Sequence, residues 1–148
     1  MKSKLDAKLI TLMEKAADFH GHLGPFLVIG VRMGNMAKRI LKPNTVEHKE
    51  LEATAKIPLL VPFSCVLDGI QATTHCTVGN QKLRIENAQK EITANFKLQN
   101  SDRALKVSVN SKIIEGLMNR ISEGALNEEL AWEIARMPES RLFTIEKR

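Results

Sequence analysis

The sequence predicts an α+β fold with a mixed, largely antiparallel sheet, and three observations support this class. Apolar residues recur every three or four positions near both ends of the chain, which is typical of amphipathic helices. Between these regions, several runs alternate apolar and polar residues, as half-buried strands do. A polar turn joins two of these runs and indicates an antiparallel hairpin. The predicted order is a helix–strand–helix–three-strand core, preceded by one helix and followed by C-terminal helices.

Two helices begin the predicted fold. Residues 5–19 place apolar side chains at helical spacing, and Gly21 is suited to end this helix because glycine readily adopts a left-handed conformation. Pro25 suits the first turn of a second helix, which we expect to run to about Leu41, ahead of Pro43. Small residues on one side of this helix would allow close contact with a strand or another helix, including one of a second copy: Gly30, Gly34 and Ala37.

The middle of the chain is predicted to hold four strands and one helix. Residues 50–57 alternate apolar and polar side chains and form the first strand. Ser64 then has the side chain of a helix N-cap, which predicts a short helix from Cys65 to about Thr73. Further strands are predicted over residues 82–87, 92–99 and 104–110. The turn-forming residues Asn100-Ser101-Asp102 favour an antiparallel hairpin for the last two.

The C-terminal part of the chain is predicted to be mainly helical. Residues 113–121 have helical apolar spacing, and Asn127 is placed to cap another helix, with two acidic residues in its first turn and Pro138 at its end. We expect a last short strand over residues 141–146. No repeat, low-complexity run or linker divides the sequence, so we expect residues 1–148 to form one domain.

Composition excludes several classes of protein. With 43% hydrophobic and 26% charged residues, the sequence is typical of a globular protein. The net charge of +5 comes from scattered basic residues, and the chain has one Trp and no Tyr for base stacking, so nucleic-acid binding is not expected. Two cysteines are too few for a disulfide framework. Met1–Lys4 leads into an amphipathic helix rather than an apolar signal sequence, and residues 57–63 are too short to cross a membrane. We therefore expect a cytoplasmic protein with no membrane segment.

The first candidate site residues are His20 and His22, on either side of Gly21. A bend at the glycine would let both imidazole rings converge, whereas a continuous helix would point them to opposite sides. Such a pair could bind a metal or act as a base. Alternatively, one histidine caps the first helix and the other is exposed. Gly24-Pro25 opens the second helix at the same junction, where free N–H groups suit an anion or a thiolate.

Cys65 is the second candidate, and it occupies the first position of a predicted helix. A helix N-terminus favours the thiolate and lowers the pKa of a cysteine. The thiolate is both a nucleophile and a metal ligand, so Cys65 is the candidate catalytic residue as well as a candidate ligand. The alternative is a buried, inert thiol that packs as a small apolar side chain.

The remaining polar residues near Cys65 leave alternatives open. Cys76 lies eleven positions further on, which on one continuous helix would be about 16 Å along the axis. Either the helix ends before Cys76 and the chain turns back, or only one cysteine contacts a shared ion. Asp68 and Gln71 could supply an oxygen ligand, a hydrogen bond to an imidazole or a substrate contact, or could simply be exposed. His75 could be a ligand or a base, but we favour a chance neighbour.

Two segments carry a resemblance to a known family. They are Phe19-His20-Gly21-His22-Leu23-Gly24-Pro25 and residues 65–80, which read C-x-x-D-G-I-Q-x-x-x-x-C-T-x-G-N. In this order they resemble the FmdE family, named for a component of formylmethanofuran dehydrogenase, over about residues 19–109. The resemblance implies an α+β core, a homodimer and a bound metal ion such as zinc. Taken with the residue chemistry, it favours metal ligation by His20, His22, Cys65 and Cys76, with Asp68 and Gln71 behind them.

The chain departs from the family pattern at three places. Members often have cysteine at the position of Gly24, and usually glycine at the position of His75. Many also carry a C-terminal cysteine-rich zinc finger, which we do not expect here because no cysteine follows Cys76. The family name implies kinship with a protein associated with a molybdenum or tungsten enzyme that reduces carbon dioxide onto methanofuran.

Three functional hypotheses follow. The first is a dimeric metal-binding protein, with zinc as the expected metal, that serves one-carbon or methanogenic metabolism. The second is a free-standing enzyme in which Cys65 is the nucleophile or redox thiol and His20 or His22 the base, acting on a small anionic substrate near Gly24. The third is a non-catalytic accessory module that binds a partner, such as a molybdenum or tungsten enzyme, through its sheet or C-terminal helices.

Overall fold

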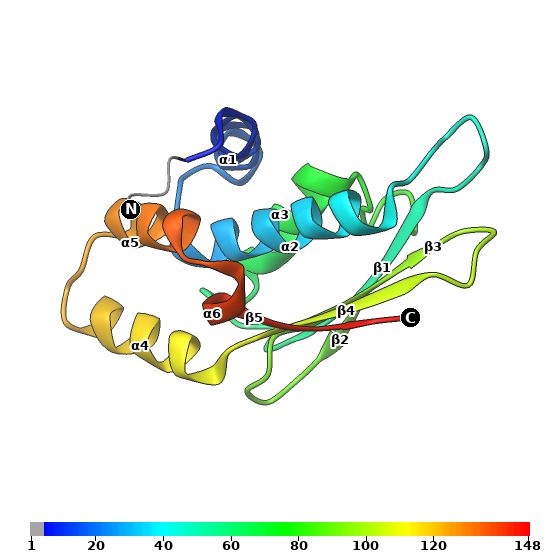
Figure 1. The fold of residues 1–148 in the computed structure, drawn as a ribbon. Coiled ribbons are helices and arrows are strands. Elements are labelled where there is room, and N and C mark those ends of the chain that lie inside the picture. Colours follow the sequence, from blue (N-terminus) through cyan, green and yellow to red (C-terminus); the bar gives the residue numbers. More distant parts are fainter. Residues whose placement is uncertain (1–4) are drawn as a thin grey trace.

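A five-stranded sheet covered on one face by helices forms the architecture of the computed structural model, which describes residues 5–148 (Figure 1). The segment Met1–Lys4, which we interpret from the sequence as a polar lead-in to the first helix, lies outside the described residues. In chain order the elements are α1 (Ala7–His20), α2 (Pro25–Leu41), β1 (Leu51–Ile57), α3 (Cys65–Thr74), β2 (Leu83–Asn87), β3 (Thr93–Leu98), β4 (Ala104–Val109), α4 (Ser111–Ser122), α5 (Asn127–Arg136), α6 (Glu139–Leu142) and β5 (Phe143–Lys147).

The sheet has the strand order β2-β1-β3-β4-β5. β1 and β2 are parallel and are joined through α3, as a parallel pair requires a crossover. All other neighbours are antiparallel, including the predicted hairpin of β3 and β4. The predicted α+β class with a mixed, largely antiparallel sheet is therefore confirmed.

The alternating sequence of the strands separates a buried face from an exposed one. In β1, Leu51, Ala53, Ala55 and Ile57 are buried, while the charged residues between them are exposed. Phe96 in β3 is fully buried on the same principle. Burying a large apolar side chain of this kind contributes about 1.5–3 kcal/mol, which is why the pattern determines the face that meets the helices.

α2 is the central helix, and it contacts α3 at two glycines. A Cβ atom on Gly30 would lie 2.1 Å from the Val66 carbonyl oxygen, and one on Gly69 would lie 2.2 Å from the Leu27 carbonyl oxygen. Gly34 similarly packs against Thr73. The prediction of close contact along this side of α2 is correct. Gly30 and Gly34 are buried against α3, however, and Ala37 is buried too, so these small residues do not provide a contact with a second copy.

A partly buried cation connects α2 to the end of α5. The Arg32 guanidinium donates hydrogen bonds to the carbonyl oxygens of Ile134 and Met137, the latter very short. Burial lowers the pKa of Arg32, opposed in part by the charge of Glu139. The Ile134 carbonyl oxygen also accepts a hydrogen bond from the backbone N–H of Met137, so Arg32 adds a second donor there at the end of α5. Nothing in the sequence pattern indicated this contact, because its partners are about a hundred positions apart.

The predicted element boundaries shift by a few residues. α4 begins earlier than expected, after Asn110, whose side chain accepts a hydrogen bond from the backbone N–H of Lys112. Asn127 is the first residue of α5 rather than its cap. The short helix α6 was not predicted, and it leads into β5, which pairs with β4 at the edge of the sheet. Among the described residues, no helix is both long and apolar enough to span a membrane.

Candidate functional site

Three helix ends meet around a small cavity of about 100 Å³. α1 ends at His20, and Gly21 turns the chain in a left-handed conformation with φ 108°. α2 begins at Pro25, and α3 begins at Cys65. The cavity is lined by His20, His22, Gly24, Pro25, Phe26, Leu27, Val61, Pro62, Cys65 and Asn127. The structure therefore brings both predicted histidines and Cys65 to one place.

A chain of hydrogen bonds holds the His20 ring. Its Nδ1 atom lies 2.6 Å from Oδ2 of Asp68, on the first turns of α3. The other carboxylate oxygen of Asp68 accepts a hydrogen bond from Gln71 Nε2 at 3.2 Å, and Gln71 in turn accepts one from the backbone N–H of Val78. An ionised carboxylate can only accept, so His20 donates from Nδ1. Asp68 and Gln71 thus orient the His20 ring and do not line the cavity themselves.

The second nitrogen of His20 has no partner. Nε2 is buried and makes no hydrogen bond with any described residue. With the proton on Nδ1, a neutral imidazole presents a lone pair at Nε2. A buried acceptor without a partner costs about 1–3 kcal/mol. This nitrogen is therefore free to bind a ligand that the chain itself does not supply.

His22 stands beside His20 but in a different environment. The two ring centroids are 4.7 Å apart at an interplanar angle of 39°. His22 is exposed, whereas the side chain of His20 is mostly buried. A Cβ atom on Gly24 would lie 3.8 Å from Nε2 of His22. A side chain at position 24 would thus lie directly next to this imidazole.

Cys65 does not have the lowered pKa that the sequence predicts. Burial raises the pKa of its thiol, and the charge of Asp68 raises it further. Ser64 has a helical backbone with φ −63° and ψ −15°, and its side chain does not cap α3. The expected thiolate stabilisation is therefore outweighed by burial and by an acidic neighbour. A metal ion that bound Cys65 would have to displace the thiol proton.

Cys76 lies apart from this cavity. The left-handed C-cap His75, with φ 62°, ends α3 and turns the chain back. Cys76 is 1% exposed, and its Sγ donates a hydrogen bond to the Leu51 carbonyl oxygen at 3.2 Å. Burial also raises the pKa of this thiol. The structure thus places Cys76 in the core, not beside Cys65.

Val61 and Asn127 are among the cavity-lining residues that the sequence did not identify. Val61 precedes the start of α3, and Asn127 opens α5. Val61 is 82% exposed, and three further large apolar side chains next to cavity-lining residues are also exposed: Phe19, Leu60 and Leu126. The only available signal was the apolar run over residues 57–63, whose exposure the pattern cannot show.

The donor set fits a transition metal in its chemistry. Two imidazoles and a thiol face one cavity, and one imidazole is oriented by a carboxylate, as metal-bound histidines usually are. Within residues 5–148, no three His, Cys, Asp or Glu side chains form a preassembled metal cluster. The fit therefore rests on donor type and on the free Nε2 atom of His20.

This fold and cavity define a class of protein: a two-layer α+β domain whose first three helix ends enclose a histidine- and cysteine-lined pocket. Residues 19–144 match the model of the family described as "FmdE, Molybdenum formylmethanofuran dehydrogenase operon". The chain therefore belongs to this family. The resemblance suggested by the two sequence segments is confirmed, and it extends beyond residue 109.

Two individual proteins are similar to this chain. A probable S-adenosyl-L-methionine-binding protein from Archaeoglobus fulgidus is 35% identical over 79 residues, which are 52% of this chain and 21% of that protein. The chain thus spans about a fifth of the length of this curated relative. A tungsten formylmethanofuran dehydrogenase FmdE-like protein from Syntrophus aciditrophicus has a crystal structure that matches with a TM-score of 0.65. The match covers 99% of this chain and 75% of that one, at 19% identity, and it shows a shared fold.

Proposed function

We propose that this protein binds one divalent transition-metal ion, with zinc as the best candidate, through His20, His22 and Cys65. The observation that carries the proposal is the buried Nε2 atom of His20, which has no partner while Asp68 holds the opposite side of the ring. A carboxylate in this position orients the imidazole and raises its basicity as a ligand. Imidazole and thiolate together favour zinc over magnesium or calcium.

Three protein donors leave one of the four usual zinc positions for water, a substrate or another protein group. When bound, such an ion supplies Lewis-acid chemistry at neutral pH. His20 is the most constrained of the donors, because Asp68 and Gln71 orient its ring. His22 is exposed at the mouth of the cavity and can move to meet a ligand. Cys65 is partly exposed, so its sulfur can be reached from the cavity.

Elemental analysis tests this proposal. The protein is purified without added metal and without a polyhistidine tag, and we expect about one zinc per chain. Cobalt replaces zinc in the same kind of site and gives thiolate-to-cobalt charge-transfer absorption. We expect this band in the wild-type protein and its loss in Cys65→Ser. His20→Ala should abolish stoichiometric binding. A wild-type protein that binds neither metal would refute the proposal.

Matched control variants exist for both residue types. Cys76→Ser keeps a hydrogen-bond donor toward Leu51, so it should retain metal binding. His48→Asn changes an exposed histidine in the left-handed region, where asparagine is also tolerated. If Cys76→Ser loses as much metal as Cys65→Ser, or His48→Asn as much as His20→Ala, the metal binding is adventitious. Circular dichroism then reports whether each variant is folded.

The assembly and metabolic role belong to the same proposal. We propose a homodimer whose contact includes the exposed apolar residues around the cavity mouth: Phe19, Leu60, Val61 and Leu126. Exposed apolar patches of this kind mark protein interfaces. The family name supports a role in one-carbon metabolism, including association with a molybdenum or tungsten enzyme. Light scattering should give twice the chain mass, and Val61→Glu should shift it to the monomer.

The alternative of a thiol-dependent enzyme is less well supported. The raised pKa of Cys65 disfavours a resting thiolate, and no hydrogen bond within the described residues links its sulfur to an imidazole. An activated nucleophile requires one or the other. Rapid alkylation of Cys65 at neutral pH in metal-free protein would favour the enzyme over the metal protein.

A further inference from the structure

A second feature of the molecule lies away from the histidine cavity, between α4 and the α5–α6 segment. A groove of about 480 Å³ runs between these helices. Its apolar lining comes from Ile113 and Leu117 on α4, and from Ile134 and Met137 at the end of α5. Ile113 and Met137 are only half-buried, so the chain does not fill this groove itself.

α4 is an amphipathic helix with an incompletely covered apolar face. Ile114 and Leu117 are buried, but Ile113, Met118 and Ile121 are each only partly covered. Figure 1 shows α4 leading away from the end of β4, with α5 on one side of it. A helix with apolar residues at this spacing normally buries the whole face against a neighbour. Of the three partly covered residues, Ile113 lines the groove, whereas Met118 lines a separate cavity beside Phe63.

Gly116 borders open space in the groove. It lies inside α4 and lines the groove, and a Cβ atom built on it would meet no atom within 4 Å. Glycine within a helix lowers stability relative to alanine, because it loses more backbone entropy on folding. No contact within the described residues requires a glycine there. The surface of α4 is therefore open at this point of the groove.

The rim of the groove is basic. Lys112, Arg136 and Arg141 line it, and none of them forms an ion pair with a described residue. The single acid, Glu133, pairs with Arg120. Arg136 also lies over the Trp132 ring, 5.8 Å from its centroid, which positions its guanidinium without neutralising its charge.

We propose that this groove binds an acidic, amphipathic helix of a partner protein. The apolar floor would take leucine-like side chains at helical spacing, and the basic rim would face glutamates or aspartates on the flanks. Two helices already form the walls, so a third helix can lay one ridge of side chains between them. This surface is independent of the metal proposal, because none of its residues lines the histidine cavity.

Synthetic helical peptides of about the length of α4 test the proposal. The probe carries leucines at i, i+3, i+4 and i+7 with glutamates on the opposite face. One control has the same composition with the leucines scattered, and a second replaces the glutamates by lysines. We expect micromolar binding of the acidic amphipathic probe by fluorescence anisotropy, at least tenfold weaker binding of both controls, and weakening by added salt.

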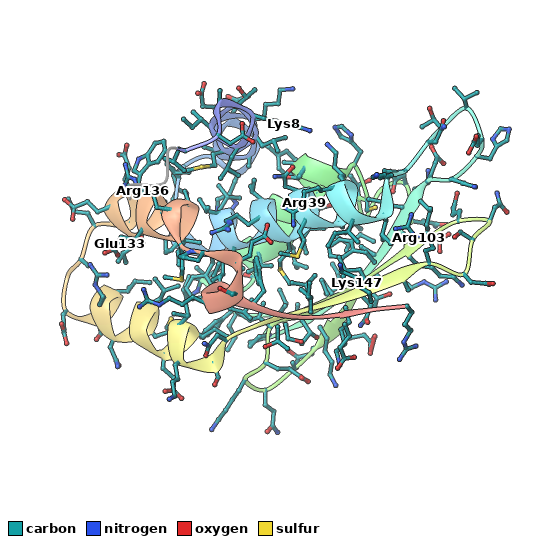
Figure 2. All side chains as sticks on the ribbon, viewed as in Figure 1. Lys8, Arg39, Arg103, Glu133, Arg136 and Lys147 are labelled. Carbon is teal, nitrogen blue, oxygen red and sulfur yellow. The ribbon has the colours of Figure 1, made fainter. Side chains whose placement is uncertain are left out.

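Substitutions in the groove test whether the peptide binds there. The double change Lys112→Glu and Arg136→Glu should weaken binding at least tenfold, whereas Lys147→Glu should change it less than twofold. Figure 2 shows that Lys147 lies well away from Arg136 and the α5 helix. Gly116→Phe should block the groove, and Gly116→Ala should preserve binding within about twofold, since its Cβ meets open space. If Gly116→Phe does not fold, the surface charge variants decide the question.

Each other outcome overturns the proposal. Equal binding of the scattered and amphipathic probes would show a nonspecific electrostatic attraction. Full competition by a single-stranded oligonucleotide at matched charge would assign the surface to nucleic acid. Self-association of the protein at high concentration that Gly116→Phe abolishes would show that the groove binds a second copy of this chain.

Discussion

The two ends of α3 carry the same pair of residue types in very different settings. At its start, Cys65 shares a cavity with His20 and His22. At its end, Cys76 follows His75, and His75 lines a larger cavity of about 680 Å³ whose other residues include three lysines. Cysteine and histidine are therefore neighbours at both ends, but only the first end leaves an imidazole nitrogen of the described residues buried without a partner.

The difference arises from hydrogen bonds that are already formed. The Cys76 thiol donates to Leu51, and His75 serves as a left-handed helix cap at the surface. The carbonyl ends of α2 and α3 also meet the second cavity, where Lys38 donates to the Thr73 carbonyl oxygen. Lys38 and Lys42 lie at the end of α2, and Lys82 pairs with Glu50. The comparison teaches that residue types close in sequence do not by themselves make a site, and that the imidazole nitrogen without a partner distinguishes the first end.

The largest expected effect comes from the contact that fixes α3 between its two ends. Gly69→Ala would place a Cβ atom 2.2 Å from the Leu27 carbonyl oxygen, which is backbone and cannot move without shifting α2. We expect a loss of about 3 kcal/mol in the free energy of unfolding. Urea denaturation measures this loss. Gly79→Ala, whose nearest neighbour is 3.9 Å away, is the control and should change stability far less.

Asp68→Asn should weaken metal binding at the start of α3 and leave the end of α3 unchanged. The asparagine amide can either donate its N–H to His20 Nδ1 or accept a weaker hydrogen bond from it through its carbonyl oxygen. The His20 ring therefore loses the carboxylate that fixes its tautomer. We expect zinc affinity to fall about 10–100-fold, with less than about 1 kcal/mol lost in stability, because the pair is partly exposed. Competition titration with a chelator measures the affinity. Unchanged affinity would show that the Asp68–His20 bond does not orient a ligand.

The two thiols should respond differently to pH in metal-free protein. Burial raises both pKa values, so alkylation by iodoacetamide at about pH 7.5 should be slower than for a free cysteine and should accelerate as the pH rises. Cys65, which is partly exposed, should react before the buried Cys76. Asp68→Asn removes a negative neighbour of Cys65, so it should move only the Cys65 profile to lower pH. Mass mapping of the labelled peptides distinguishes the two residues, and identical shifts would refute this assignment.

The smallest effect is expected at the second cavity. Lys82 forms a very short ion pair with Glu50, and both side chains are partly exposed. Such pairs contribute about 0–1 kcal/mol, so Lys82→Gln should lower the free energy of unfolding by less than that and leave zinc binding unchanged. A chemical denaturation series at low and high salt measures it. A loss of metal binding in Lys82→Gln would connect the two ends of α3 and break the comparison.

Local sequence by itself determined most of the secondary structure. Steric preferences act within a few residues, so Gly21 ends α1 and Pro25 starts α2 where predicted. Period-two burial identifies β1 for the same reason, because the side chains of a strand alternate between its faces. The two histidines around Gly21 and the thiol of Cys65 were also identified, since donor types are visible in the sequence.

Tertiary structure alone decided how these donors are used. The Asp68–His20 bond joins residues 48 positions apart, and the Gly30–Gly69 contact depends on how two helices cross. The direction of the Cys65 pKa shift follows from burial and from Asp68, which a helix position cannot reveal. Cys76 lies outside the site, and its thiol donates a hydrogen bond to the carbonyl oxygen of Leu51 on β1. Solvation and long-range hydrogen bonds depend on the whole fold, and for that reason they were not predictable from local pattern.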